Sequence, residues 1–218
     1  MNFLLKATNL NIYILYKGVK HRLEMHPAII GWFSFWTVYW LTEGLFPSDE
    51  RSKNIVPSAR VDRIVARNMM LLLPYGIIFW ELMPDISPYV TETFFIRYVI
   101  SALLMDGWFY FVHRLLHHPW FYTWHKQHHQ FNIPYPLVAV YSSPLEALLC
   151  DGTAIGLGPT LFKMSGLELQ IWMALMALHA LLIHSSTYHG RDHNIHHGKN
   201  LYNFGLLSVF DRIFGTYR

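Results

Sequence analysis

Long apolar stretches with few charges constrain the fold of this chain most strongly. They occupy residues 26–42, 68–80, 93–112, 137–162 and 168–184. A helix needs about 20 predominantly apolar residues to cross a bilayer, and only helices or closed barrels satisfy their backbone groups there. Charged residues make up 14% of the chain, whereas soluble domains carry about 25%. We therefore predict an all-α integral membrane bundle with about four spanning or embedded helices.

The charges that remain indicate an orientation. Residues 1–25 mix short apolar runs with Lys and Arg, so we expect an amphipathic segment on the membrane surface. The polar connector at 47–67 is rich in Arg and Lys, as is the region after residue 112. Positive charge collects on the cytosolic side of membrane proteins, so we place both regions there.

Two simple counts exclude other classes of protein. The net charge of +3 is scattered along the chain, which favours membrane topology over nucleic-acid binding. The single cysteine, Cys150, excludes a disulfide framework and a cysteine-based zinc site.

Histidine is the chemically informative residue type. Twelve of the 14 histidines follow residue 112, and most fall in three motifs: HRLLHH at 113–118, HKQHH at 125–129 and HNIHH at 193–197. Residues at i, i+3 and i+4 share a helix face. We therefore predict one two-nitrogen face and two three-nitrogen faces, made by His113 and His117, by His125, His128 and His129, and by His193, His196 and His197.

This many imidazoles exceeds the needs of one metal ion. A first-row ion takes roughly four to six ligands, so eight histidines predict two ions close together. His184, or else His179 or His189, would supply a ninth ligand. His21, His26 and His118 are interpreted as ordinary core or surface residues. The absence of HExxH disfavours a zinc protease. A non-catalytic membrane protein that carries metal or electrons stays an alternative.

The three motifs in this order resemble the sterol desaturase/fatty acid hydroxylase superfamily, which are membrane-bound non-haem di-iron oxygenases. His118-Pro119 ahead of Trp124 and the endings Tyr202–Gly205 and Asp211–Arg218 strengthen the resemblance. It is nearest the sterol desaturase and hydroxylase branch. It covers residues 95–218, expected to form one continuous catalytic region after an N-terminal membrane-associated region at 1–94.

The sequence departs from that pattern in three places. The loop between His184 and His193 is shorter than the superfamily usually has. Ser142–Glu146 stands where relatives often have His-Pro-x-Glu. No fused cytochrome b5-like haem domain is recognisable, so we expect the electron donor to be a separate protein.

The resemblance implies an O2-dependent oxidoreductase of lipid biosynthesis that hydroxylates or desaturates a lipid, with a sterol favoured and a fatty-acyl or ether lipid as the alternative. It implies two iron ions, electrons from a donor such as cytochrome b5 with an NAD(P)H reductase, and, in a eukaryote, the endoplasmic reticulum membrane with the histidines facing the cytosol. The implied metal ligands are His113, His117, His125, His128, His129, His184, His193, His196 and His197, with His179 and His189 as substitutes. Carboxylates expected to accept hydrogen bonds from the ligands are Asp106, Glu146, Asp192 and Asp211.

Overall fold

Helices make up almost all of the structure. The computed structural model describes residues 12–16, 19–23, 25–45, 56–86, 93–132, 134–185 and 190–218. The one sheet in this part of the chain is an antiparallel pair, β1 (Ile12–Tyr16) with β2 (Val19–Leu23). Part of the segment expected on the membrane surface is therefore a strand pair.

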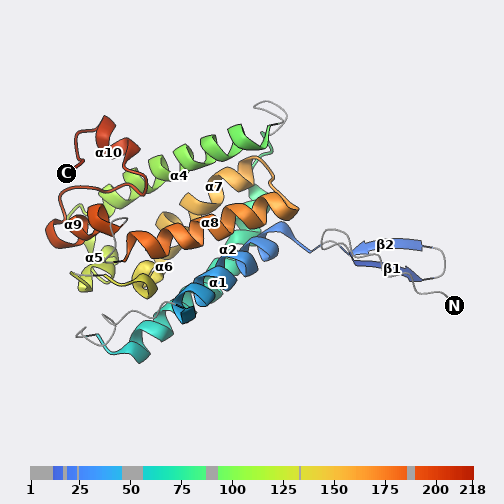
Figure 1. The fold of residues 1–218 in the computed structure, drawn as a ribbon, viewed down its shortest axis with the longest axis horizontal. Coiled ribbons are helices and arrows are strands. Elements are labelled where there is room, and N and C mark those ends of the chain that lie inside the picture. Colours follow the sequence, from blue (N-terminus) through green and yellow to red (C-terminus); the bar gives the residue numbers. More distant parts are fainter. Residues whose placement is uncertain are drawn as a thin grey trace.

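Three helices are long and apolar enough to cross a membrane: α2 (Ser58–Leu82), α4 (Phe94–Leu116) and α8 (Gly166–Ile183). The 19-residue α1 (Pro27–Leu45) packs along α8, and α7 (Thr153–Leu161) packs along α4 (Figure 1). The predicted all-helical membrane bundle is confirmed.

The polar connector differs from the prediction. Residues 47–67 were expected to lie outside helices, yet α2 begins at Ser58 and carries Arg60, Arg63 and Arg67 in its first turns. A helix can continue beyond the apolar layer with its basic side chains in water, because its backbone hydrogen bonds are internal.

The apolar stretch at 137–162 is broken into short pieces. A 3-10 turn, η3 (Pro136–Val140), is followed by α6 (Pro144–Glu146), the π-helix η4 (Ala147–Gly152) and then α7. Proline stands at the start of η3 and of α6, where its missing N–H costs nothing. Ser143 Oγ accepts the Glu146 N–H at 3.2 Å, which caps α6.

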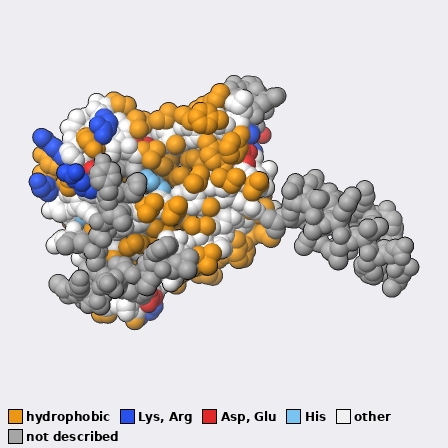
Figure 2. All heavy atoms as spheres, in the orientation of Figure 1, with side chains coloured by type: hydrophobic (Ala, Val, Ile, Leu, Met, Phe, Trp, Pro, Cys, Tyr) orange, Lys and Arg blue, Asp and Glu red, His pale blue; other side chains and the backbone are white. Residues whose placement is uncertain are grey.

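The remaining short elements gather at one end of the bundle. They are α5 (Tyr122–His125), η2 (His128–Gln130), α9 (Arg191–Lys199) and α10 (Val209–Ile213), beside the end of α4 (Figure 1). Figure 2 shows Lys and Arg concentrated at this end and hydrophobic side chains over the helices. Exposed apolar side chains such as Phe95, 73% exposed, fit a lipid-facing surface.

Candidate metal centre

Five segments that are distant in sequence bring the histidines together. His113 and His117 come from the end of α4, His125 from α5, and His128 and His129 from η2. His184 caps the end of α8, while His193, His196 and His197 lie on α9. Eight of these nine side chains are buried and His117 is half-buried.

The nine imidazoles form two groups able to hold one metal ion each. The first group contains His113, His117, His125, His129 and His196. The second group contains His128, His184, His193 and His197. The groups adjoin, because the ring centroids of His129 and His197 are 4.7 Å apart.

The predicted three-nitrogen faces are wrong in one respect. In each motif the i and i+4 histidines share a group, as His193 and His197 do, but the i+3 histidines His128 and His196 join the other group. At about 100° per residue, positions i+3 and i+4 of a helix diverge by that same angle. Each HxxHH motif therefore contributes to both groups.

Hydrogen bonds at Nδ1 set the tautomer of six of these histidines. His113, His196 and His197 donate Nδ1–H to the carbonyls of Phe204, Tyr202 and Phe131 at 2.7–2.8 Å. The others donate to Glu146 (His125, 2.7 Å), Tyr141 (His128, 3.4 Å) and Ala180 (His184, 2.8 Å). A neutral imidazole carries one N–H, so each of these rings presents a bare Nε2 lone pair.

Those lone pairs face one another. The Nε2 atoms of His113 and His125 are 3.0 Å apart, and His128 Nε2 is 3.1 Å from His197 Nε2. Neither atom of either pair has a proton to share, so the contacts are not hydrogen bonds. A cation between the nitrogens turns this repulsion into coordination, and the donor set therefore fits a metal ion.

The distances between the Nε2 atoms also fit a bound metal ion. In the second group, four Nε2 atoms form a closed ring with sides of 3.0–3.3 Å. In the first group, successive Nε2 atoms are 3.0–3.1 Å apart. Ligands about 2.1 Å from an ion and at right angles to one another lie about 3.0 Å apart.

Burial keeps these imidazoles neutral. It lowers the pKa of His117 and His128 to about 4, and the pKa of His184 and His196 to about 3. A metal ligand must be unprotonated, so the site is ready to bind metal at neutral pH.

Glu146 contacts one of these histidines. Its Oε1 accepts the Nδ1–H of His125 at 2.7 Å, and both side chains are buried. A carboxylate in this position fixes the ring orientation and makes the other nitrogen a stronger ligand. Ser143 caps the helix that carries Glu146.

Asp106 and Asp211 act differently from the prediction. Asp106 accepts backbone N–H groups of Leu207, Val209 and Phe210 at 2.7–3.1 Å, and Asp211 accepts those of Phe204 and Gly205 at 2.7–2.8 Å. Both carboxylates bind the loop after α9 instead of an imidazole. That loop supplies the Tyr202 and Phe204 carbonyls, so these aspartates support the histidines through the backbone.

The remaining predicted residues lie elsewhere. Asp192 contributes its carbonyl, which accepts Asn203 Nδ2–H at 3.0 Å. His179 lies outside both groups, with its Nε2 3.1 Å from the Leu206 carbonyl, whereas His189 lies outside the described residues. His26 contacts Glu81, and His118 is exposed.

Side-chain patterns alone did not predict the carbonyls that orient the rings. One available signal was Asn203, which adopts a left-handed conformation with φ of 55°. Its side chain bonds to the Asp192 carbonyl and to the backbone of Arg218, which fixes the loop beside Phe204. Asparagine is among the few residues that tolerate this conformation.

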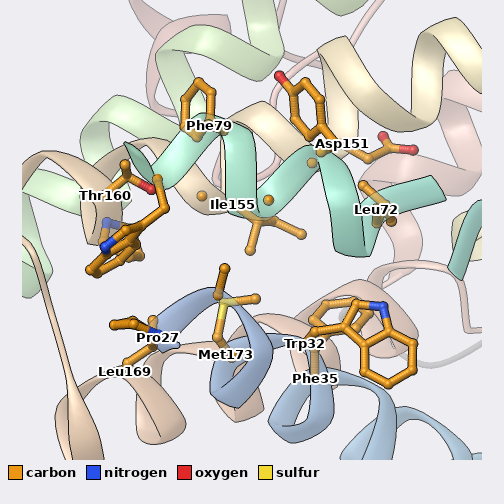
Figure 3. A pocket seen from close by; sticks show the side chains of 18 of the residues that line it. Pro27, Trp32, Phe35, Leu72, Phe79, Asp151, Ile155, Thr160, Leu169 and Met173 are labelled. Carbon is orange, nitrogen blue, oxygen red and sulfur yellow. The ribbon is translucent and has the colours of Figure 1, made fainter. Parts of the chain in front are cut away.

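Two adjoining cavities share part of their lining, and the second reaches the histidines. The first is apolar, lies between α1, α2, α7 and α8 (Figure 3), and measures about 780 Å³ including its open mouth. The second is lined by His113 and His125 of the first group and His128 and His184 of the second. Phe35, Val140, Asp151 and Ile155 line both cavities.

Together, the fold and the site define a membrane-embedded helical protein with two adjoining histidine groups, each able to hold a metal ion, beside an apolar cavity. Residues 98–216 match the fatty acid hydroxylase family. The chain belongs to this family, within the sterol desaturase superfamily of O2-dependent lipid hydroxylases, and the predicted resemblance is confirmed.

Relatives with different substrates in their names are similar to the chain. Very-long-chain aldehyde decarbonylase GL1-9 of Oryza sativa is 29% identical, over 78% of this chain and 74% of its own length. Sphinganine C4-monooxygenase 2 of Arabidopsis thaliana is 28% identical, over 83% of this chain and 84% of its own length. Methylsterol monooxygenase 1 of Rattus norvegicus is 35% identical, over 66% of this chain and 51% of its own length. No solved structure matches the chain.

Proposed function

We propose that this chain binds two iron ions and uses O2 to oxidise a C–H bond of a membrane lipid. The observation that carries the proposal is the pairing of bare Nε2 lone pairs within both histidine groups. One ion would be held by His113, His117, His125, His129 and His196. The other would be held by His128, His184, His193 and His197.

In the reaction, the protein itself would hold the metal ions, orient the histidine rings and exclude water. Bound iron would supply reduction of dioxygen and oxidation of an unactivated C–H bond, using electrons delivered from outside. Glu146 and the carbonyls of Phe204 and Phe131 hold the rings in one orientation. Phe35, Val140 and Ile155 surround the approach with apolar walls, which keep water away from the reacting carbon.

A sterol is the favoured substrate. Similarity to methylsterol monooxygenase supports it, and so does an apolar cavity wide enough to be lined by four helices. Lipid would enter sideways from the bilayer, because the cavity lies between the membrane helices.

A straight-chain lipid is the second candidate. Similarity to sphinganine C4-monooxygenase 2 extends over 83% of this chain and 84% of that protein, so it covers most of both proteins. A fatty-acyl or ether lipid would occupy the same cavity.

A separate electron donor completes the proposal. Figure 2 shows basic side chains gathered at the histidine end of the bundle. The elements at this end carry six exposed basic residues: Arg114, Lys126, Arg191, Lys199, Arg212 and Arg218. They would attract an acidic donor such as cytochrome b5, itself reduced by an NAD(P)H reductase. The same charges favour a cytosolic position for this end, in the endoplasmic reticulum membrane of a eukaryote. Residues 1–94 would then serve membrane association and 95–218 catalysis.

Metal content, the visible spectrum and lipid products of the purified protein test the proposal together. We expect about two irons per chain, no Soret band, and an O2-dependent product from a methylsterol or from sphinganine. A His128→Ala/His196→Ala variant should lose metal and product, and His118→Ala is the matched control. A Soret band, or a folded wild type that binds no metal, would favour the electron-carrier alternative.

A further inference from the structure

Four residues form the boundary between the apolar cavity and the cavity that contains the histidines: Phe35, Val140, Asp151 and Ile155. Three of them are hydrocarbon or aromatic, as expected where a lipid passes. Asp151 is the exception, because it brings a carboxyl group to the boundary of an otherwise apolar path. Figure 3 shows it at one end of the apolar cavity, with its carboxylate turned away from Ile155 and Met173.

The carboxyl group of Asp151 has few partners in the protein. Its Oδ2 accepts a hydrogen bond from Ser142 Oγ at 3.3 Å, and no other hydrogen bond or ion pair reaches it within the described part of the chain. The side chain is half-buried, and a carboxyl group partly withdrawn from water is costly unless hydrogen-bond donors surround it. The folded protein therefore leaves acceptor capacity free where lipid would approach the histidines.

The surrounding structure holds this carboxyl group in place. Asp151 lies in the π-helix η4, an irregularity that is rare and often occurs at functional sites. Its partner Ser142 is fully buried, and the Ser142 carbonyl accepts hydrogen bonds from Arg67 at 2.6 Å and Gln127 at 2.8 Å. The position of Asp151 is thus tied to α2 and to the segment that carries His125 and His128.

We propose that Asp151 binds a hydroxyl group of the lipid substrate and thereby selects the carbon that is oxidised. The hydroxyl would donate to the free acceptor positions of the carboxyl group, and the hydrocarbon body would fill the apolar cavity. Carbon atoms close to the hydroxyl would then lie in the cavity that both histidine groups line. This inference rests on the proposed oxidation of a membrane lipid, and it deepens it by naming the feature of the lipid that is recognised.

Matched lipid pairs test the inference by binding, without iron. The probes are a 3-hydroxysterol with its 3-O-methyl ether, and octadecanol with its methyl ether. Each ether keeps the hydrocarbon body but loses the donor. Competition against a radiolabelled lipid on metal-free protein in nanodiscs gives the affinity ratio within each pair. We expect wild type to prefer at least one hydroxyl lipid by about 10-fold or more, as for a hydrogen bond to a charged group.

Variants of Asp151 decide whether this side chain causes the preference. Asp151→Leu should reduce the ratio to about one, and Asp151→Asn, which keeps the shape, should reduce it in part. Asp62→Asn, an acidic residue that lines neither cavity, should keep the full ratio. If Asp151→Leu does not fold, the affinity ratio is measured in Ser142→Ala, which removes the hydrogen bond that holds the Asp151 carboxyl group. Equal binding of both members of each pair by wild type, or an unchanged ratio in Asp151→Asn and Asp151→Leu, would overturn the inference.

The products formed by iron-loaded protein separate this inference from the proposed function. If Asp151 places the lipid, Asp151→Asn should spread oxidation over more than one carbon, whereas a purely structural role would lower the amount of product without changing its position. A wild type that prefers the hydroxyl lipid but forms no O2-dependent product would refute the oxidation and leave the binding role standing. Turnover without any preference for the hydroxyl lipid would refute the binding role of Asp151 and leave the proposed oxidation standing. The sterol and octadecanol pairs show which kind of lipid carries the hydroxyl.

Discussion

His128 and His129 are neighbours in the chain, but their imidazoles belong to different histidine groups. His128 Nε2 lies 3.1 Å from His197 Nε2, and His129 Nε2 lies 3.1 Å from His196 Nε2. The HH pairs of HKQHH and HNIHH are both divided in this way, so each of these two motifs supplies histidines to both groups.

The grouping predicts which histidine substitutions remove one metal ion and which remove both. Replacing His128, His184, His193 and His197 with alanine empties only the second group, so about one ion per chain should remain. Replacing His129, His193, His196 and His197 takes ligands from both groups, so neither ion should be retained. Elemental analysis of the purified variants measures this. Equal metal content in the two variants would contradict the division.

Glu146 should tune the affinity of the first group. Glu146→Gln keeps the shape but removes the negative charge beside His125 Nδ1. Loss of such a partner typically weakens metal binding by about 10- to 100-fold. Titration with a competing chelator measures the change. Glu81→Gln, at the exposed pair with His26, is the control and should leave the affinity unaltered.

The loop after α9 should not accept a side chain at Gly205. A Cβ there would lie 2.7 Å from Asp106 Oδ1 and 2.9 Å from Asp211 Oδ2. Gly205→Ala should therefore displace the loop that orients His113 and His196, and should destabilise the protein by about 1–3 kcal/mol. Thermal unfolding with metal analysis checks both effects. Gly198→Ala, where nothing lies within 4 Å of the added Cβ, should be neutral or stabilising, and an equal loss there would refute the explanation.

Acid should destabilise the metal-free protein. Burial lowers the pKa of His128 to about 4 and that of His184 to about 3, whereas an unfolded histidine titrates near pH 6.5. Between these values the unfolded state binds more protons, so the free energy of unfolding should fall as the pH drops from about 6.5 towards 4. Melting temperatures across this range measure the effect. His128→Gln/His184→Gln should flatten the slope, and an unchanged slope would contradict it.

The basic surface around the histidine end should control electron delivery. Arg191→Glu/Lys199→Glu should lower turnover driven by an acidic donor protein, and the effect should shrink at high salt because screening weakens the attraction. Turnover with a small chemical reductant should stay the same, which separates donor docking from damage to the centre. A parallel loss in both assays would argue against docking at this surface.

Several features followed from the sequence alone. The apolar stretches with few charges were long enough to predict membrane helices, because a backbone that spans lipid must form its hydrogen bonds internally. Twelve histidines in a short region predicted a metal centre from residue type and spacing, and nine of them do lie together. Glu146 was named as a hydrogen-bond acceptor for the expected ligands, and in the structure it contacts His125; its effect on a metal ion stays a prediction.

Other features depended on the folded chain. Which histidines share a group follows from how η2 and α9 meet, since positions i+3 and i+4 diverge by about 100° and either can turn to a given ion. The carbonyls of Tyr202, Phe204 and Phe131 orient the rings, and every residue has a carbonyl, so no residue type marks them. In the sequence Asp151 is one charge in an apolar stretch, and only packing places it in the lining of two cavities. Local spacing and composition determined the chemistry available, whereas contacts between distant segments decided how it is arranged.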